Sequence, residues 1–131
     1  MGTELTTTQK NTLSTISTHS LGEVLKPLTH EILLFDSYIA GTTHIEDESV
    51  FNTVKDGDSL VLQREPDNRF DEYAILVLNG EGRKLGYIPE KDNLVFARLM
   101  DAGKLLTAKI VHMENKGSFR QINIDIYLVD F

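Results

Sequence analysis

The clearest alternation of apolar and polar positions lies near the C-terminal end of the chain. Ile122, Ile124, Ile126 and Leu128 are separated by polar or aromatic residues, and this period of two is typical of a strand with one buried face. Shorter apolar runs bounded by turn residues predict five more strands, at residues 32–40, 60–62, 73–78, 84–88 and 105–112. The Asn-Gly-Glu-Gly segment at 79–82 predicts a hairpin between two of them.

Two segments show helical spacing instead. Acidic residues at 46–48 favour a helix N-terminus through the dipole, which predicts a short helix near 48–54. A second helix is predicted at 92–102, with Asp92 or Asn93 as its N-cap and Gly103 after its end. Strands this short favour closure, because closure leaves no free sheet edge. The pattern predicts a mainly β fold with two short helices, either a small six-stranded β-barrel or a sandwich.

Composition adds a boundary to this picture. The chain has 131 residues, enough for one domain with a core. Ser and Thr occupy 10 of the 18 positions at 3–20, which predicts a flexible extension at 1–30 and a barrel domain at 31–131. The absence of cysteine excludes disulfides and thiolate metal sites. No apolar run has transmembrane length and no secretory signal opens the sequence, so we expect a cytoplasmic protein without a membrane partner.

The net charge of −7 limits the kind of partner. Residues 1–59 hold 9 of the 20 acidic side chains but only 3 of the 13 basic ones, so residues 60–131 are close to neutral. A protein that follows a long phosphate backbone carries a basic stripe. None is visible in the sequence, so any nucleic-acid footprint is predicted to be small.

The segment from Arg64 to Asp71 has the highest density of informative residues. It lies between two predicted strands, and Pro66 disfavours helix there, so it is predicted to be a loop. Asn68 is a turn former, but a turn does not also need an arginine, an aspartate and an aromatic residue. This excess indicates a binding site.

Each of these residues also has a purely structural interpretation. Asn68 can close the turn through its own backbone, and Asp71 can bond the amides of the loop. Phe70 can be a plug of the core, since its apolar surface is large. Arg64 can form an ion pair and nothing else. The sequence leaves both interpretations open.

Residues 62–75, Leu-Gln-Arg-Glu-Pro-Asp-Asn-Arg-Phe-Asp-Glu-Tyr-Ala-Ile, are followed at 85–89 by Leu-Gly-Tyr-Ile-Pro. These two motifs, at this separation, resemble the HIRAN domain family. The resemblance implies an OB-like β-barrel that, in a DNA-binding member of the family, binds the 3′-hydroxyl end of single-stranded DNA. We also expect Gly41 and Gly86 to lie where backbone or ligand approaches closely, as glycine in a strand often does.

The resemblance implies roles residue by residue. Asn68, Phe70 and Asp71 match the family's loop residues, and an aromatic face can stack a base while a carboxylate accepts from a hydroxyl. Tyr87 stands where the DNA-binding member has a histidine. The predicted nucleic-acid-binding residues are Thr43, His44, Arg64, Asn68, Phe70, Asp71, Tyr87 and Lys91.

The sequence also departs from the family pattern. Thr43 and His44 replace an arginine followed by an aromatic residue, so one phosphate-binding charge is lost. Glu90 replaces a lysine, although Lys91 is adjacent. Phe119 is a candidate for a late aromatic residue of the family.

The resulting functional prediction is a nucleic-acid-binding module that recognises single-stranded DNA ends in DNA repair or processing. It has no predicted catalytic residue, cofactor or metal, and a helicase or nuclease is a candidate partner protein. A protein-interaction module of a larger DNA-processing complex is the alternative, supported by the acidic N-terminal half. Glu65, Asp67 and Asp71 are a third, weaker possibility as a divalent-metal cluster for phosphodiester hydrolysis. The sequence does not choose between DNA and RNA and does not give the oligomeric state.

Overall fold

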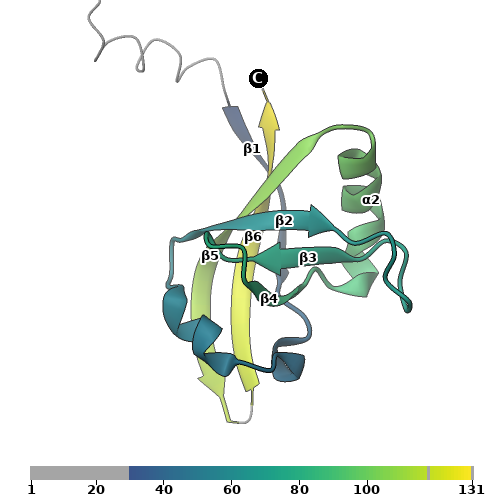
Figure 1. Ribbon diagram of the computed structural model, residues 1–131. Coiled ribbons are helices and arrows are strands. Elements are labelled where there is room, and N and C mark those ends of the chain that lie inside the picture. Colours follow the sequence, from purple (N-terminus) through teal and green to yellow (C-terminus); the bar gives the residue numbers. More distant parts are fainter. Residues whose placement is uncertain (1–29, 118, 131) are drawn as a thin grey trace, which may run out of the picture. The chain divides into compact units, whose positions relative to one another are not determined.

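The fold is built on one curled sheet. The computed structural model describes residues 30–117 and 119–130. Its six strands follow the order β1-β6-β5-β2-β3-β4 in the sheet (Figure 1). The pairings of β2 with β3 and β5, of β3 with β4 and of β5 with β6 are antiparallel. The strands are β1 (His30–Tyr38), β2 (Ser59–Arg64), β3 (Ile75–Leu78), β4 (Lys84–Tyr87), β5 (Leu105–Lys116) and β6 (Phe119–Asp130).

The two ends of this sheet meet just after β1. Ala40 and Tyr87 exchange backbone hydrogen bonds of 2.7 and 2.9 Å, which join β4 back to the chain that leaves β1. A Cβ at Gly86 would collide with the carbonyl oxygen of Ala40 and the side chain of Ile39. Gly86 is therefore needed for closure, as expected. The predicted six-stranded β-barrel is confirmed.

Gly41 has a different reason to be glycine. Its φ of 77° lies in the left-handed region, which glycine adopts without strain. A Cβ there would meet only the Tyr87 ring, at an ordinary 3.9 Å. For Gly41 the backbone turn, rather than a close approach of backbone, explains the residue.

The predicted alternation in β6 fills the core. Ile122, Ile124 and Ile126 are fully buried, and the residues between them are partly exposed. They pack with buried side chains of the neighbouring strands, and each such burial contributes about 1.5–3 kcal/mol. All four residues of β3 are buried, so this strand lacks alternation although it lies in an antiparallel sheet.

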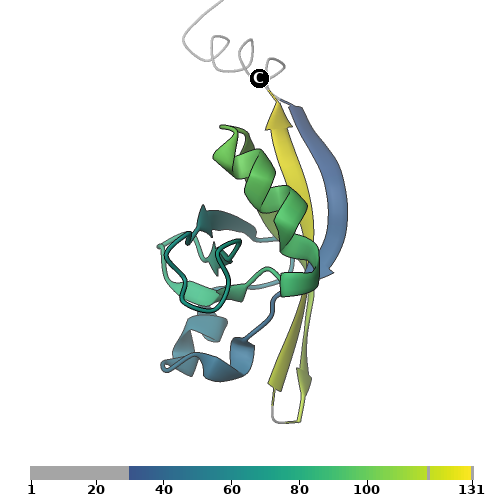
Figure 2. The ribbon, with the colours of Figure 1, turned by 90° about the vertical axis from the view of Figure 1, so that its right-hand side faces the viewer.

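Three helical segments flank the sheet. η2 (Thr42–His44) and η3 (Glu48–Thr53) are 3₁₀ helices, so the segment predicted near 48–54 is helical but not α-helical. Within residues 30–117 and 119–130, α2 (Glu90–Asp101) is the α-helical element. Phe96 of α2 and Phe35 of β1 have ring centroids 5.8 Å apart, and the ribbon of α2 runs along the sheet in Figure 2.

Several predicted boundaries were wrong, since β1 ends at Tyr38 and β5 continues to Lys116. β3 begins at Ile75, because Tyr73 and Ala74 donate backbone bonds to Asp71 and close the loop before the strand. α2 begins directly after Pro89, whose φ of −56° suits a helix start, so neither Asp92 nor Asn93 is its cap. The predicted extension at 1–30 lies, apart from His30, outside the described residues and stays a prediction.

Candidate nucleic-acid interface

The loop between β2 and β3, residues 65–74, is held by the side chain of Asn68. Its Oδ1 accepts from the backbone N–H groups of Phe70 and Asp71, at 2.8 and 3.0 Å. Its Nδ2 donates to Glu65 Oε1 at 2.7 Å and lies 3.5 Å from the Tyr87 hydroxyl. An amide has two donors and one acceptor oxygen with two lone pairs. Asn68 has therefore used its capacity inside the loop, as its structural interpretation predicted.

Glu65 joins this loop to the barrel. Its Oε1 also accepts from the hydroxyl of Tyr87, at 2.7 Å. The hydrogen bond from Tyr87, and then the one from Asn68, lowers the pKa of the Glu65 carboxyl, so Glu65 stays ionised. Lys84 donates to the same Tyr87 hydroxyl at 3.2 Å and lies 4.4 Å from the centre of its ring. The contacts with Glu65 and Lys84 thus fix the position of the Tyr87 side chain.

Phe70 stands at the tip of the loop and is 93% exposed. Its interpretation as a plug of the core is therefore wrong. Burial of a phenyl side chain stabilises a fold by about 1.5–3 kcal/mol. In the described structure Phe70 does not make this contribution. The ring is available to stack on a ligand.

Asp71 is braced but keeps free acceptor positions. Oδ1 accepts from the backbone N–H of Tyr73 at 2.9 Å, and Oδ2 accepts from Asn93 Nδ2 at 2.6 Å. Asn93 is 2% exposed and lies in the first turn of α2, so it holds the carboxylate firmly. A carboxylate has about four acceptor sites. Asp71 can still accept from a ligand.

These side chains meet at one pocket, here called the Phe70 pocket, with a volume of about 270 Å³. It brings together four of the eight predicted site residues, which lie on two separate segments of the chain. Backbone closure also shapes it, because Ala40 and Gly41 form one wall. Its lining is Ala40, Gly41, Asn68, Phe70, Asp71, Ala74, Tyr87, Ile88 and Glu90.

Arg64 does not line the Phe70 pocket. Its guanidinium donates to the carboxylate of Asp101 at 2.9 and 3.3 Å and to the carbonyl oxygens of Glu72 and Ala74 at 2.9 and 2.6 Å. Only 14% of its side chain is exposed. These contacts tie both ends of the loop to the end of α2, as the structural interpretation of Arg64 predicted.

Thr43 and Lys91 line two neighbouring pockets. The Thr43 pocket, about 460 Å³, is formed by residues 38–43 and 119–121 and shares Ala40 and Gly41 with the Phe70 pocket. Phe119, the candidate late aromatic residue, lies here and is 44% exposed. His44 is exposed at the end of η2 and lies outside the lining of these three pockets.

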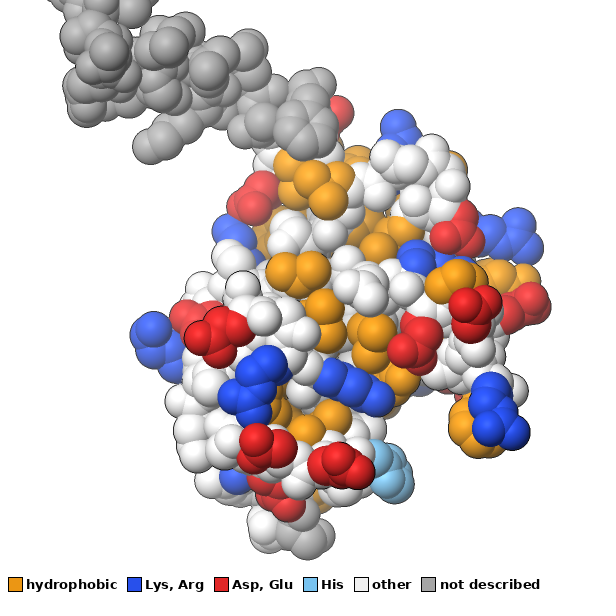
Figure 3. Space-filling model, in the orientation of Figure 1, with side chains coloured by type: hydrophobic (Ala, Val, Ile, Leu, Met, Phe, Trp, Pro, Cys, Tyr) orange, Lys and Arg blue, Asp and Glu red, His pale blue; other side chains and the backbone are white. Residues whose placement is uncertain are grey.

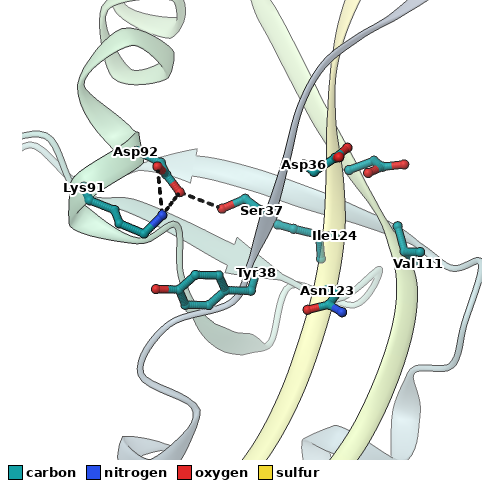
Figure 4. Close-up of a pocket in the computed structure, with 9 residues that line it drawn as sticks. Asp36, Ser37, Tyr38, Lys91, Asp92, Val111, Asn123 and Ile124 are labelled. Carbon is teal, nitrogen blue, oxygen red and sulfur yellow. Dashed lines mark hydrogen bonds and ion pairs between the residues drawn. The ribbon is translucent and has the colours of Figure 1, made fainter.

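The Lys91 pocket, about 560 Å³, is acidic. Lys91 and Ser37 both turn toward the carboxylate of Asp92, at 3.2 and 3.1 Å (Figure 4). Burial, and then the hydrogen bond with Asp36, raises the pKa of the Asp125 carboxyl on the same wall. The charge of Lys91 is thus already balanced within its own pocket.

Charge on the visible face is mixed. Acidic and basic side chains alternate over the surface in Figure 3, and no basic stripe crosses it. Arg69 is exposed next to Phe70, and its side chain forms no hydrogen bond or ion pair with another described residue. Sequence reasoning missed Arg69, although its position beside an aromatic residue in a loop was a usable signal. It also missed Asn93, whose partner lies 22 residues away.

Two features are absent from the part of the chain that the structure describes. No group of three or more His, Cys, Asp or Glu side chains is placed to hold a metal ion. Glu65 and Asp71, from the weaker metal-cluster interpretation, instead accept hydrogen bonds from neighbouring side chains. No helix in the described part of the chain is long and apolar enough to cross a membrane.

Solved structures share this fold. A protein from Lactobacillus plantarum matches with a TM-score of 0.72 and 25% identity, over 79% of this chain and 99% of that one. The HIRAN domain of human HLTF matches with a TM-score of 0.65 and 18% identity, over 80% and 82%. The HLTF HIRAN domain in its DNA-bound conformation matches with a TM-score of 0.56 and 20% identity, over 76% and 79%.

Sequence comparison gives the family. No curated protein matches the chain. The family model of the HIRAN domain matches residues 32–129, which includes the loop, the closure and α2. Together with the barrel, this match identifies the chain as a member of the HIRAN domain family.

Proposed function

We propose that the protein is a nucleic-acid-binding module that receives the 3′-hydroxyl end of a single strand in the Phe70 pocket. The observation that carries the proposal is an exposed phenyl ring beside a braced carboxylate that still has acceptor positions. Membership of the HIRAN family supports it, and the DNA-bound conformation of the HLTF domain makes single-stranded DNA the first ligand to test.

The two side chains have separate tasks in this proposal. Phe70 stacks on the terminal base, which is worth about 1–3 kcal/mol per base. Asp71 accepts the hydrogen bond of the terminal hydroxyl, a charge-assisted contact of about 1.5–3 kcal/mol. A 3′-phosphate in the same place would bring like charges together. End specificity then depends on Asp71, and general affinity on Phe70.

The remaining predicted residues support this pair or supply little charge. Asn68 and Tyr87 hold the loop against the barrel and act on the ligand by positioning Phe70 and Asp71. Thr43 contributes no cation, Lys91 faces Asp92, and Glu90 is acidic. We expect weak binding over a small footprint, with Arg69, exposed beside Phe70, as a candidate cation.

The proposal is tested with short fluorescent DNA strands of one sequence that end in a 3′-hydroxyl or a 3′-phosphate. We expect the hydroxyl end to bind more tightly, and Phe70→Ala to weaken both. Asp71→Asn should narrow the preference between the two ends. Asp67→Asn is the matched control, because Asp67 is exposed in the same loop and does not line the pocket. Equal binding of both ends to the unaltered protein would contradict end recognition.

A second candidate function, a protein-interaction module, is favoured by β1. This strand lies at one end of the sheet order, and Ile32, Leu33 and Phe35 are 44, 53 and 42% exposed. An exposed edge strand can accept a strand from a partner protein. Failure to bind either DNA end would favour this function. A role in DNA repair, with a helicase or nuclease as partner, stays a prediction.

A further inference from the structure

The charged groups of the Phe70 pocket are unusual for a nucleic-acid site. The two ionisable carboxyl groups that line it are those of Asp71 and Glu90, and no lysine or arginine does. Glu90 is exposed, and its side chain forms no hydrogen bond or ion pair with another described residue. Both carboxylates can accept hydrogen bonds from whatever occupies the pocket.

The other polar groups of the pocket have little left to donate. The amide of Asn68 is engaged by Glu65 and by the loop backbone. The hydroxyl of Tyr87 donates to Glu65. The pocket therefore suits a ligand that donates hydrogen bonds, such as one with hydroxyl groups, and disfavours a phosphate.

One carboxylate belongs to the first turn of α2, and the other accepts a hydrogen bond from that turn. Glu90 is its first residue, and Asn93, which donates to Asp71 at 2.6 Å, is three residues later. Residues three apart on a helix share one face. Asp71 and Glu90 thus both lie at the first turn of α2 and line one pocket, to which they present two acceptors.

We propose that these two acceptors select a terminal ribose, so that the pocket prefers the 3′ end of RNA to that of DNA. The inference rests on the proposed function. A terminal ribose carries neighbouring 2′ and 3′ hydroxyl groups, whereas a deoxyribose carries only the 3′ hydroxyl. Carboxylates bind ribose hydroxyls in dinucleotide-binding proteins, and the 2′ hydroxyl is the group by which proteins distinguish RNA from DNA. Asp71 accepts from the 3′ hydroxyl and Glu90 from the 2′ hydroxyl.

The experiment uses three strands of identical DNA sequence that differ only in the last sugar: deoxyribose, ribose or 2′-O-methyl ribose. All three end in a 3′-hydroxyl. We expect the ribose end to bind the full chain about tenfold more tightly than the deoxyribose end, since one charge-assisted hydrogen bond is added. The 2′-O-methyl end, which has no 2′ donor, should lose this gain.

Glu90→Ala should bring the ribose and deoxyribose ends to equal affinity, because the acceptor for the 2′ hydroxyl is removed. Glu72→Ala is the matched control, because Glu72 is exposed in the neighbouring loop and lies outside the pocket lining. Melting temperatures of both variants check that α2 is intact. Equal binding of ribose and deoxyribose by the unaltered protein, or a preference that survives Glu90→Ala, would overturn the inference and leave the proposed function standing. Binding to none of the three ends would overturn both.

Discussion

Glu65 is the residue through which the loop depends on the barrel. One of its oxygens accepts from Asn68 on the loop and from Tyr87 on β4. This contact sets the orientation of the Asn68 amide, so that its oxygen faces the N–H groups of Phe70 and Asp71. The ligand-facing residues are thus positioned by a carboxylate that does not line their pocket.

An exchange of charge between these two positions tests this role. Asn68→Asp would place a second carboxylate against Glu65 and should lower the free energy of unfolding by about 1–3 kcal/mol. It should also weaken binding of a 3′-hydroxyl strand. Adding Glu65→Gln places an amide that can donate a hydrogen bond against the new carboxylate at position 68. The double variant should therefore recover much of the lost stability and much of the lost binding. Urea unfolding and oligonucleotide titration measure the two effects.

The single variant Glu65→Gln serves as the reference for this exchange. A double variant no better than Asn68→Asp alone would show that the loop does not depend on the pairing of Glu65 with Asn68. A double variant that recovers stability but not binding would show that the pairing stabilises the loop without positioning the residues that bind the strand.

At the scale of elements, two connections form the site. The closure of Ala40 onto Tyr87 supplies one wall of the Phe70 pocket. The loop is joined to α2 at both ends of the helix, by Asp71 with Asn93 and by Arg64 with Asp101. The shape of the pocket therefore depends on the positions of β4, the loop and α2 together.

Gly86→Ala tests the closure. Its added methyl group would meet the carbonyl of Ala40, and overpacking of this kind costs about 1–3 kcal/mol. Gly80→Ala makes the same chemical change in open space, with nothing within 4 Å. We expect a large fall in melting temperature for the first variant and a small change for the second. Similar melting temperatures for both would contradict a tight closure at Gly86.

The elements show which features could be predicted from sequence. The strands and the hairpin at 79–82 were predictable because burial and turn chemistry are local. The start of α2 was not, because Asp92 and Asn93 have the composition of caps. Their side chains instead bond Ser37 and Asp71, 55 and 22 residues away. Phe70 was equally ambiguous, since the sequence alone does not show whether a phenyl ring in a loop turns inward.

At the scale of the whole molecule, the mixed surface charge and the lack of basic residues at the pocket determine how binding depends on salt. The net charge is −7, and the Phe70 pocket has no basic residue in its lining. For single strands, each phosphate contact lowers the logarithm of the binding constant by about 0.7 for every tenfold rise in salt concentration. A ligand held by stacking and hydroxyl contacts releases few counterions. The affinity of this protein should therefore change little with salt.

Glu90→Lys tests this property. It places a cation at the pocket, so it should tighten binding of a DNA strand and steepen the salt slope by about one unit. Titrations at several salt concentrations measure both. Glu46→Lys makes the same substitution at an exposed position away from the pocket lining and should leave the slope nearly unchanged. An unaltered slope for Glu90→Lys would show that Glu90 does not face the strand.

The central claim is that a 3′-hydroxyl strand end, and not a 3′-phosphate end, occupies the Phe70 pocket. Amide chemical-shift mapping of the isotope-labelled chain by NMR tests it most directly. Titration with a short 3′-hydroxyl strand should shift the amides of residues 68–71, Gly41 and Tyr87, which lie on or beside the pocket. A 3′-phosphate strand of the same sequence should shift them much less at equal concentration. Shifts confined to the β1 edge at residues 30–38, or equal shifts with both strands, would contradict the claim.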